Sequence, residues 1–325
     1  MKVGIVGAGA IGGWMAVKLA QCGCELNVLA RGATLAALCE RGLRLQEGGA
    51  TTTVPVRASD DPAQLGAQDL VIAAVKAPAM ADVAAKVGAL LGPSTSVLTA
   101  MNGVPWWFFE GFGGRYAGTR LAAVDHDGGI AAAIPASHIV GCVVHAACSS
   151  IGPGQAKHTF GNRLIIGEPS GARTERVQQL HALLQRAGFE SVLSEQIQKD
   201  IWYKLWGNMT VNPVSALTGA TTDLIMADDL VRGFVSSVML EAREIGARIG
   251  IPIEQQPQDR HQVTMKLGAF KTSMLQDVEA GRPVELDALV TVVKELGALT
   301  GVATPFTDTL LGLARLQARV RGLYY

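Results

Sequence analysis

The sequence predicts an α/β domain with a Rossmann-type parallel sheet, followed by an all-α domain. Three observations support this prediction. Short apolar runs alternate with helical patterns over the first 120 residues, which is typical of a parallel sheet covered by helices. A glycine-rich turn follows the first apolar run, and the pattern from about Thr174 onward is helical. The chain has 325 residues, enough for two domains, which we expect at 1–170 and 171–325.

The individual elements follow from the spacing of apolar residues, because strands and helices repeat with different periods. The first half predicts strands at Lys2–Val6, Glu25–Leu29, Thr52–Val56, Asp69–Val75 and Ser96–Thr99, helices at Ile11–Gln21, Leu35–Arg41 and Ala79–Leu91, and strands and hairpins within 120–168. The second half predicts helices at Glu175–Arg186, Ile197–Val211, Leu224–Ile249, Gln262–Ala280, Leu286–Thr300 and Thr304–Arg321. Glycines that favour helix ends stand at 250, 281 and 301.

Composition excludes several classes of function. The chain has 28 basic and 28 acidic residues, a balance that argues against a nucleic-acid or acidic-membrane surface. No apolar run reaches the ~18 residues that a membrane span requires. Five cysteines without regular spacing predict free thiols in a reducing cytoplasm rather than disulfides or a metal site.

The first motif is a glycine pattern between a strand and a helix. Residues 3–14 read VGIVGAGAIGGW, in which Gly7, Gly9 and Gly12 form G-x-G-x-x-G. The first glycine permits a tight turn, the second lets a pyrophosphate approach the backbone, and the third lets the helix pack on the strand. A dinucleotide is therefore expected against the whole turn, which comprises Gly7, Ala8, Gly9, Ala10, Ile11 and Gly12. The alternative is a tight turn that binds nothing.

The end of the second strand favours NADP over NAD. NAD sites carry an Asp or Glu there, whereas this chain has Ala30 followed by Arg31, whose guanidinium can pair with a 2′-phosphate. Lys76 follows the fourth strand and Asn102 the fifth, both at places that line the ligand crevice of such sheets. The alternatives are a surface arginine at position 31 and an ordinary Asn-Gly turn at position 102.

A column of polar residues crosses an apolar helix in the second half. In DIWYKLWGNMTVNPVSAL, residues 200–217, Lys204, Asn208 and Asn212 recur every four positions and share one helix face. Burying them without partners is costly, so the column must face water or a ligand. A lysine in a partly dry site can act as a general acid, and amides can orient a carboxylate or carbonyl. We also expect Pro213 to kink or break this helix.

Several motifs together resemble the ketopantoate reductase family, the 2-dehydropantoate 2-reductases of pantothenate biosynthesis. They are GAGAIG near the start, VKAP at 75–78, NG at 102–103, KDIWYKLWGNMTVNPVSAL at 199–217 and KTSMLQDVEAGRPVELDAL at 271–289. The resemblance implies NADPH-dependent reduction of ketopantoate to pantoate. With the charge balance, it predicts a small 2-keto acid as the partner, no nucleic-acid or membrane partner, and a homodimer as an open possibility.

The resemblance also implies a role for each matching residue. Lys204 and Glu285 correspond to the catalytic pair, and Asn208, Asn212 and Ser273 to substrate-binding residues. Arg31 and Lys76 correspond to phosphate-binding residues, and Asn102 to an asparagine between cofactor and substrate.

The sequence departs from the family pattern in three places, one of which is the segment 121–150, longer and richer in histidine than the family pattern predicts. Val290-Thr291 replaces a frequent Asn-Gly, and Thr222 replaces an asparagine that some members carry. These differences leave open a related reductase that acts on another small 2-keto acid. A third reading is an NADP-binding sensor without catalysis.

Overall fold

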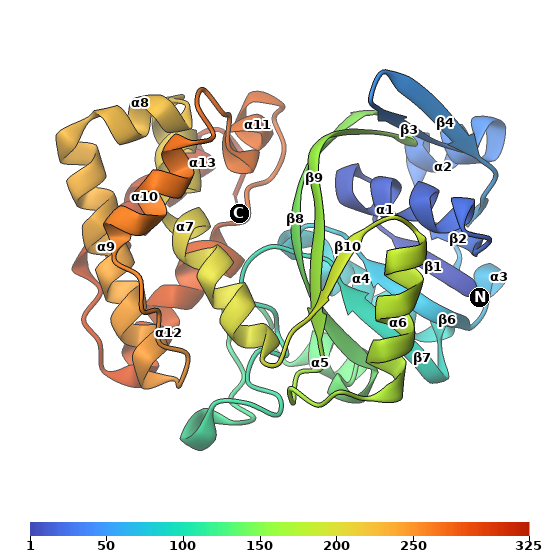
Figure 1. Ribbon diagram of the computed structural model, residues 1–325, viewed down its shortest axis with the longest axis horizontal. Coiled ribbons are helices and arrows are strands. Elements are labelled where there is room, and N and C mark those ends of the chain that lie inside the picture. The colour runs from blue at the N-terminus through green and yellow to red at the C-terminus, as the bar shows by residue number, and fades with distance from the viewer. Residues whose placement is uncertain (325) are drawn as a thin grey trace. The chain divides into compact units, whose positions relative to one another are not determined.

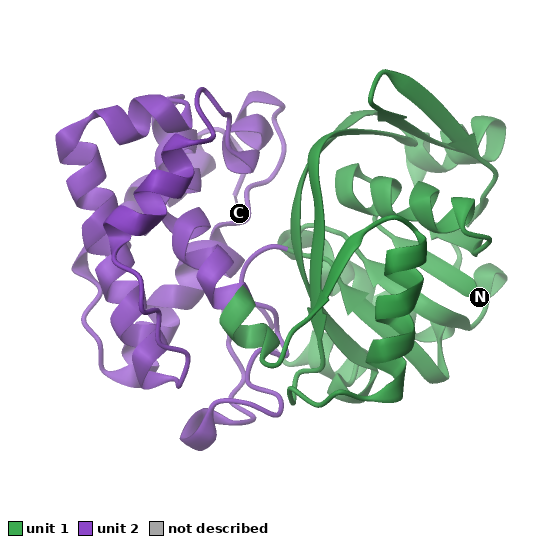
Figure 2. Ribbon diagram, viewed as in Figure 1, with its two compact units in different colours: residues 1–101, 128–200 green, residues 102–127, 201–325 purple. Residues whose placement is uncertain are grey.

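The computed structural model describes residues 1–324, which divide into two compact units. Figure 2 shows unit 1, residues 1–101 and 128–200, and unit 2, residues 102–127 and the chain from 201 onward. The α/β plus all-α class is confirmed. The unit boundaries differ from the expected 1–170 and 171–325, because a helix and a strand after residue 170 join the first unit, whereas residues 102–127 pack on the second.

Unit 1 is built on one twisted sheet in the order β4-β3-β9-β8-β7-β6-β1-β2-β5, with β10 beside β9. Its strands are β1 (Lys2–Val6), β2 (Glu25–Leu29), β3 (Leu43–Glu47), β4 (Ala50–Val54), β5 (Arg57–Ser59), β6 (Gln68–Ala73), β7 (Leu91–Thr99), β8 (Ile139–Gly152), β9 (Gln155–Gly167) and β10 (Glu190–Leu193). The predicted parallel sheet is mixed, because β3–β4 and β8–β9 are antiparallel. The hairpin β8–β9 confirms the strands expected within 120–168.

The helices of unit 1 are α1 (Ala10–Gln21), α2 (Gly32–Arg41), α3 (Pro62–Leu65), α4 (Met80–Val87), α5 (Gly129–Ala133) and α6 (Glu175–Arg186) (Figure 1). Helix α1 buries Trp14 and Met15 in the core cluster that holds Val3 and Ile5 of β1. The helix expected at 79–91 is shorter than predicted, because the chain passes through a 3-10 turn at Gly88–Leu90 and β7 begins at Leu91.

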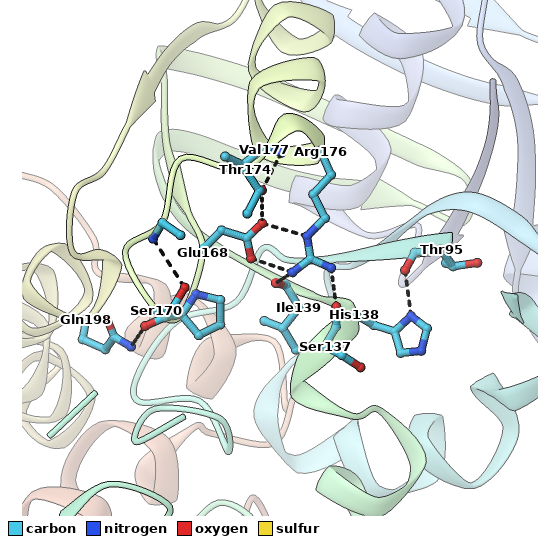
Figure 3. Close-up of polar contacts among 12 residues, drawn as sticks. Thr95, Ser137, His138, Ile139, Glu168, Ser170, Thr174, Arg176, Val177 and Gln198 are labelled. Carbon is cyan, nitrogen blue, oxygen red and sulfur yellow. Dashed lines mark hydrogen bonds and ion pairs between the residues drawn. The ribbon is translucent and has the colours of Figure 1, made fainter. Parts of the chain in front are cut away.

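A partly buried ion pair joins the start of α6 to the sheet of unit 1 (Figure 3). Arg176 Nε donates to Glu168 Oε1 at 2.7 Å, and Thr174, the N-cap of α6, donates its hydroxyl to the same carboxylate. The Arg176 guanidinium also donates to the backbone carbonyl of Ile139, at the start of β8. Hydrogen bonding to Glu168 raises the pKa of Arg176. The apolar face of α6, with Leu180 and Leu184, packs in the core cluster of unit 1, and the ion pair adds a polar anchor at its start.

Unit 2 is helical, and its helices are α7 (Ile197–Thr218, entering the unit at Ile201), α8 (Thr222–Ala227), α9 (Asp229–Arg248), α10 (Pro257–Met265), α11 (Ser273–Glu279), α12 (Val292–Thr300) and α13 (Pro305–Val320). Two predicted helices were wrong in extent. The helix expected at 224–249 is split because Asp228 caps α9 by accepting from two backbone N–H groups. The helix expected at 262–280 is split because Thr272 caps a new helix, α11.

Pro213 does not break α7, which continues to Thr218, so the predicted break is wrong. The residues around it are buried, and packing outweighs the one backbone hydrogen bond that a proline removes. The glycines expected at helix ends are confirmed, since Gly250, Gly281 and Gly301 all have positive φ.

The segment 102–127 is held to unit 2 by its backbone. Val104 N donates to Ala288 O at 2.9 Å, and the N–H groups of Ala122 and Ala123 donate to Glu295 at 2.7 and 2.9 Å. This segment connects β7 to α5, yet its contacts place Asn102 in the helical unit.

Candidate functional site

The glycine turn after β1 has the geometry that a dinucleotide needs. Gly7 has φ +95°, and a Cβ there would lie 2.8 Å from the Ala74 carbonyl oxygen. A Cβ on Gly12 would overlap the carbonyl oxygen of Gly7, so only glycine lets α1 pack this closely. Nothing lies within 4 Å of a Cβ built on Gly9. The surface over Gly9 is therefore open for a pyrophosphate, at the N-terminus of α1.

Two basic residues lie at the same edge of the sheet as this turn. Val6 pairs with Leu29 of β2 and with Ala73 of β6, so the carboxyl ends of the three strands are neighbours. Arg31 follows β2 by two residues, and Lys76 follows β6 by three. The Arg31 side chain is 78% exposed, and its contact with Asp82 at 3.9 Å is weak, so the guanidinium is accessible to a phosphate.

The polar column of α7 stands out from a buried helix. Trp202, Leu205, Trp206 and Met209 are almost fully buried, and Trp206 Nε1 donates to the Met239 carbonyl at 2.7 Å. The column itself is less enclosed, since Lys204 and Asn208 are only partly buried. The Asn208 amide makes no hydrogen bond to any residue from 1 to 324, which leaves its donor and acceptor available to a ligand.

Lys204 is held by an amide from the 102–127 segment. Its Nζ donates to Asn102 Oδ1 at 2.8 Å. An amide oxygen accepts this hydrogen bond without taking the proton, so Lys204 stays a proton donor. Asn102 thus belongs to unit 2 with the lysine, whereas the other residues predicted to bind the cofactor belong to unit 1.

At the other end of the column, Asn212 meets Ser273. Asn212 Nδ2 donates to Ser273 Oγ at 3.4 Å, a long hydrogen bond. Ser273 is exposed at the first position of α11, directly after the N-cap Thr272. The two substrate-binding candidates thus lie side by side in unit 2.

Glu285 is buried. The segment that follows it contacts the turn at Asn102-Gly103, which we call the Asn102 turn. Three residues after Glu285, the backbone of Ala288 accepts from Val104 N, and Gly103 packs so closely on Ala288 that no side chain would fit. Ala288 lies in a π-helical turn, Asp287–Thr291, of a kind often found at functional sites. Val290-Thr291, the departure from the family pattern, belongs to this turn.

Sequence reasoning missed one neighbour of α7. Arg260 of α10 lies over the Tyr203 ring, with Cζ 5.4 Å from the centroid, and against Gly207 of α7. The only signal was a glycine inside a long apolar helix, which indicates a close approach without naming the partner.

The described residues, 1–324, contain no group of three or more His, Cys, Asp or Glu side chains that could hold a metal ion. In the same part of the chain, no helix combines the length and apolarity needed to cross a membrane.

Comparison with known proteins gives consistent matches along the chain. The family model "Ketopantoate reductase PanE/ApbA" matches residues 3–171, and its C-terminal counterpart matches 196–318. The 2-dehydropantoate 2-reductase of Mesorhizobium japonicum is 46% identical over 325 residues, covering 100% of both chains. The crystal structure of a provisionally assigned ketopantoate reductase from Ralstonia solanacearum has 56% identity and a TM-score of 0.95 over 99% of both chains. A dimeric ketopantoate reductase from Staphylococcus aureus has the same fold at 20% identity, with a TM-score of 0.75 over 99% of this chain and 100% of its own.

Proposed function

The chain belongs to the ketopantoate reductase family, and from that premise we propose that it reduces 2-dehydropantoate to pantoate with NADPH. The observation that carries the proposal is the hydrogen bond from Lys204 to Asn102, which holds an ammonium group beside a partly open polar column. A bound NADPH would supply the hydride. The chain itself must bind a keto acid and protonate the oxygen on which charge develops.

In this proposal unit 1 binds NADP. The open backbone of the Gly7–Gly12 turn receives the pyrophosphate, and Arg31 pairs with the 2′-phosphate. Lys76, at the same sheet edge, adds a second positive charge. The residues present therefore fit the cofactor that the family uses.

Unit 2 supplies the acid chemistry. Lys204 donates a proton to the carbonyl oxygen of the substrate, which avoids a free alkoxide. Asn102 holds the lysine in position, and Asn208 offers its unused amide to the substrate. Asn212 and Ser273 contact the substrate further along α7, and Glu285 binds a hydroxyl of the substrate and orients the lysine.

We expect the protein to work in a reducing cytoplasm, since the structure has five free cysteines. We also expect a homodimer. The Staphylococcus aureus relative is dimeric. The apolar residues Phe306, Leu313, Leu316 and Val320 are 45%, 55%, 62% and 80% exposed and recur on α13 at spacings of seven, three and four, the spacing of helices that pack on a second helix. Sedimentation equilibrium of the wild type and of Leu316→Lys tests this, because the charged variant should be monomeric.

Steady-state NADPH oxidation with a panel of 2-keto acids tests the proposed activity. Turnover that is fastest with 2-dehydropantoate supports it. Fast turnover of another acid, with no turnover of 2-dehydropantoate, identifies a related reductase. Tight NADPH binding without turnover of any acid identifies a sensor.

A further inference from the structure

The chain that follows α13 contacts the segment of Glu285 at two places. Leu323 O accepts a hydrogen bond from Val284 N at 3.1 Å, and Tyr324 Oη donates to Asp287 Oδ1 at 2.7 Å. Glu285 is buried between these two attachment points, one residue after the first and two residues before the second. The residues after α13 therefore hold the chain on both sides of this glutamate.

A glycine turns the chain back toward that segment. Helix α13 ends at Val320, and Gly322 has φ +66°. The N–H of Leu323 donates to Ala318 O at 2.8 Å, the hydrogen bond that closes a helix end when the next glycine is left-handed. Leu323 is buried, as is common for an apolar residue after such a glycine. We call residues 322–324 the α13 turn.

Two contacts hold the Tyr324 side chain. Burial raises the pKa of Tyr324 to about 12, and the hydrogen bond to Asp287 acts in the same direction, so the hydroxyl stays protonated at neutral pH. The Arg319 guanidinium lies over the ring, with Cζ 5.6 Å from its centroid. Thr291 Oγ1 also donates to Asp287 Oδ1, at 2.9 Å. Asp287 thus joins the α13 turn to the π-helical turn Asp287–Thr291.

The π-helical turn also contacts the residues that hold Lys204. Ala288 of this turn accepts a hydrogen bond from Val104 N and packs on Gly103. Asn102, directly before Gly103, accepts from Lys204 Nζ. The π-helical turn is therefore in contact with both the α13 turn and the Asn102 turn, all within unit 2.

We propose that the α13 turn is a positioning element for Glu285, and that Tyr324 acts on the reaction through that glutamate. The inference rests on the proposed reductase function and deepens it. In that function Glu285 binds a hydroxyl of the substrate and orients the lysine, and both roles require the carboxylate at a fixed place. A misplacement of about 1 Å can slow a reaction roughly a hundredfold, so contacts on both sides of Glu285 should affect turnover.

A double-mutant cycle tests the inference. Tyr324→Phe removes the hydroxyl and keeps the ring, and should lower kcat/KM for 2-dehydropantoate roughly tenfold, the loss of one hydrogen bond to a carboxylate. In the Glu285→Gln background the same substitution should change kcat/KM by less than about twofold, because residues that act as one unit are not additive. Arg321→Gln, at an exposed position beside Gly322, should have no effect in either background. An equal loss in both backgrounds, or no loss in either, would overturn the inference.

A pair of glycines separates position from stability. Gly322→Ala and Gly250→Ala each place a side chain at a left-handed glycine after a helix, and neither new Cβ meets an atom within 4 Å. The two helix ends match, since Ile251 N donates to Gly246 O at 2.8 Å. Both variants should lower the melting temperature similarly, because left-handed φ is unfavourable for alanine. Only Gly322→Ala should also lower kcat/KM, and an equal loss of activity in both would contradict the positioning role.

A binding measurement separates this inference from the proposed activity. Calorimetric titration with pantoate of each NADP-loaded protein of the cycle gives a Kd without turnover. If the wild type reduces no keto acid but Tyr324→Phe weakens pantoate binding only when Glu285 is present, the activity fails and the positioning role stands. If the wild type reduces 2-dehydropantoate and Tyr324→Phe has the same effect on binding and turnover with and without Glu285, the activity stands and the positioning role fails.

Discussion

The two units build their functional surfaces in different ways. In unit 1 the turn from Gly7 to Gly12 presents backbone N–H groups. Its glycines matter because they have no Cβ, which leaves room for close packing and for a ligand. In unit 2 the groups are side chains, brought by α7, by the Asn102 turn, by α11 and by the segment of Glu285. A backbone surface depends on a short stretch of chain, whereas a side-chain surface depends on tertiary packing. Substitutions in unit 1 should therefore change mainly NADPH binding or folding, whereas substitutions in the α7 column of unit 2 should change mainly turnover.

The largest effect is expected at the proton donor. Lys204→Ala should lower kcat by roughly 10²–10⁴-fold, the usual contribution of a positioned general acid, and leave the Kd for NADPH within about twofold. Steady-state kinetics and a fluorescence titration with NADPH measure the two quantities. Lys199→Ala, an exposed lysine of the same helix, is the control. Weaker NADPH binding with normal turnover would contradict the role of Lys204.

The next effect distinguishes two glycines of one turn. Gly12→Ala places a Cβ against the backbone of Gly7, which cannot move without the strand, and should destabilise the fold by about 3 kcal/mol. Gly9→Ala meets nothing within 4 Å, so the free energy of unfolding should change by under about 1 kcal/mol while NADPH binding weakens. Urea unfolding and NADPH titration measure both. Normal NADPH affinity in Gly9→Ala would place the pyrophosphate elsewhere.

The same contrast explains what the sequence could predict. The glycine turn, its flanking strand and helix, and Arg31 lie within 30 residues, and local pattern was enough to find them. Lys204, Asn208 and Asn212 were also visible, because one helix carries all three. Their partners were not visible from pattern alone. Asn102 is 102 positions from Lys204 and Ser273 is 61 from Asn212, so only folding brings them together.

The errors in the fold have the same origin. The break between α8 and α9 depends on Asp228 accepting backbone hydrogen bonds, a choice that the apolar pattern does not reveal. The continuation of α7 through Pro213 depends on packing around it. The packing of Arg260 on Gly207 was overlooked because the two residues lie 53 positions apart in the chain.

A smaller effect is expected where unit 1 does use a side chain. Arg31→Ala should raise the KM for NADPH about tenfold, the loss of one exposed charge-assisted contact, and hardly change that for NADH. Arg41→Ala, an exposed arginine at the end of α2, should alter neither. Equal changes for NADPH and NADH in Arg31→Ala would remove the case for a 2′-phosphate contact.

The smallest effect concerns stability and pH in unit 2. His261, next to Arg260 on α10, is buried and lies 2.8 Å from Ser236 Oγ. Burial, with a contribution from Arg232, lowers its pKa, so the folded protein takes up this proton at a lower pH than the unfolded chain, which does so near pH 6.5.

Stability is therefore full above pH 6.5 and falls as the pH drops toward the folded-state pKa, by at most about 1.4 kcal/mol per pH unit. Urea unfolding between pH 7.5 and 5.5 should show a shallower pH dependence for His261→Gln than for the wild type. His126→Gln, at an exposed position, should keep the wild-type dependence. If His261→Gln keeps it as well, acid destabilisation of the protein begins outside α10.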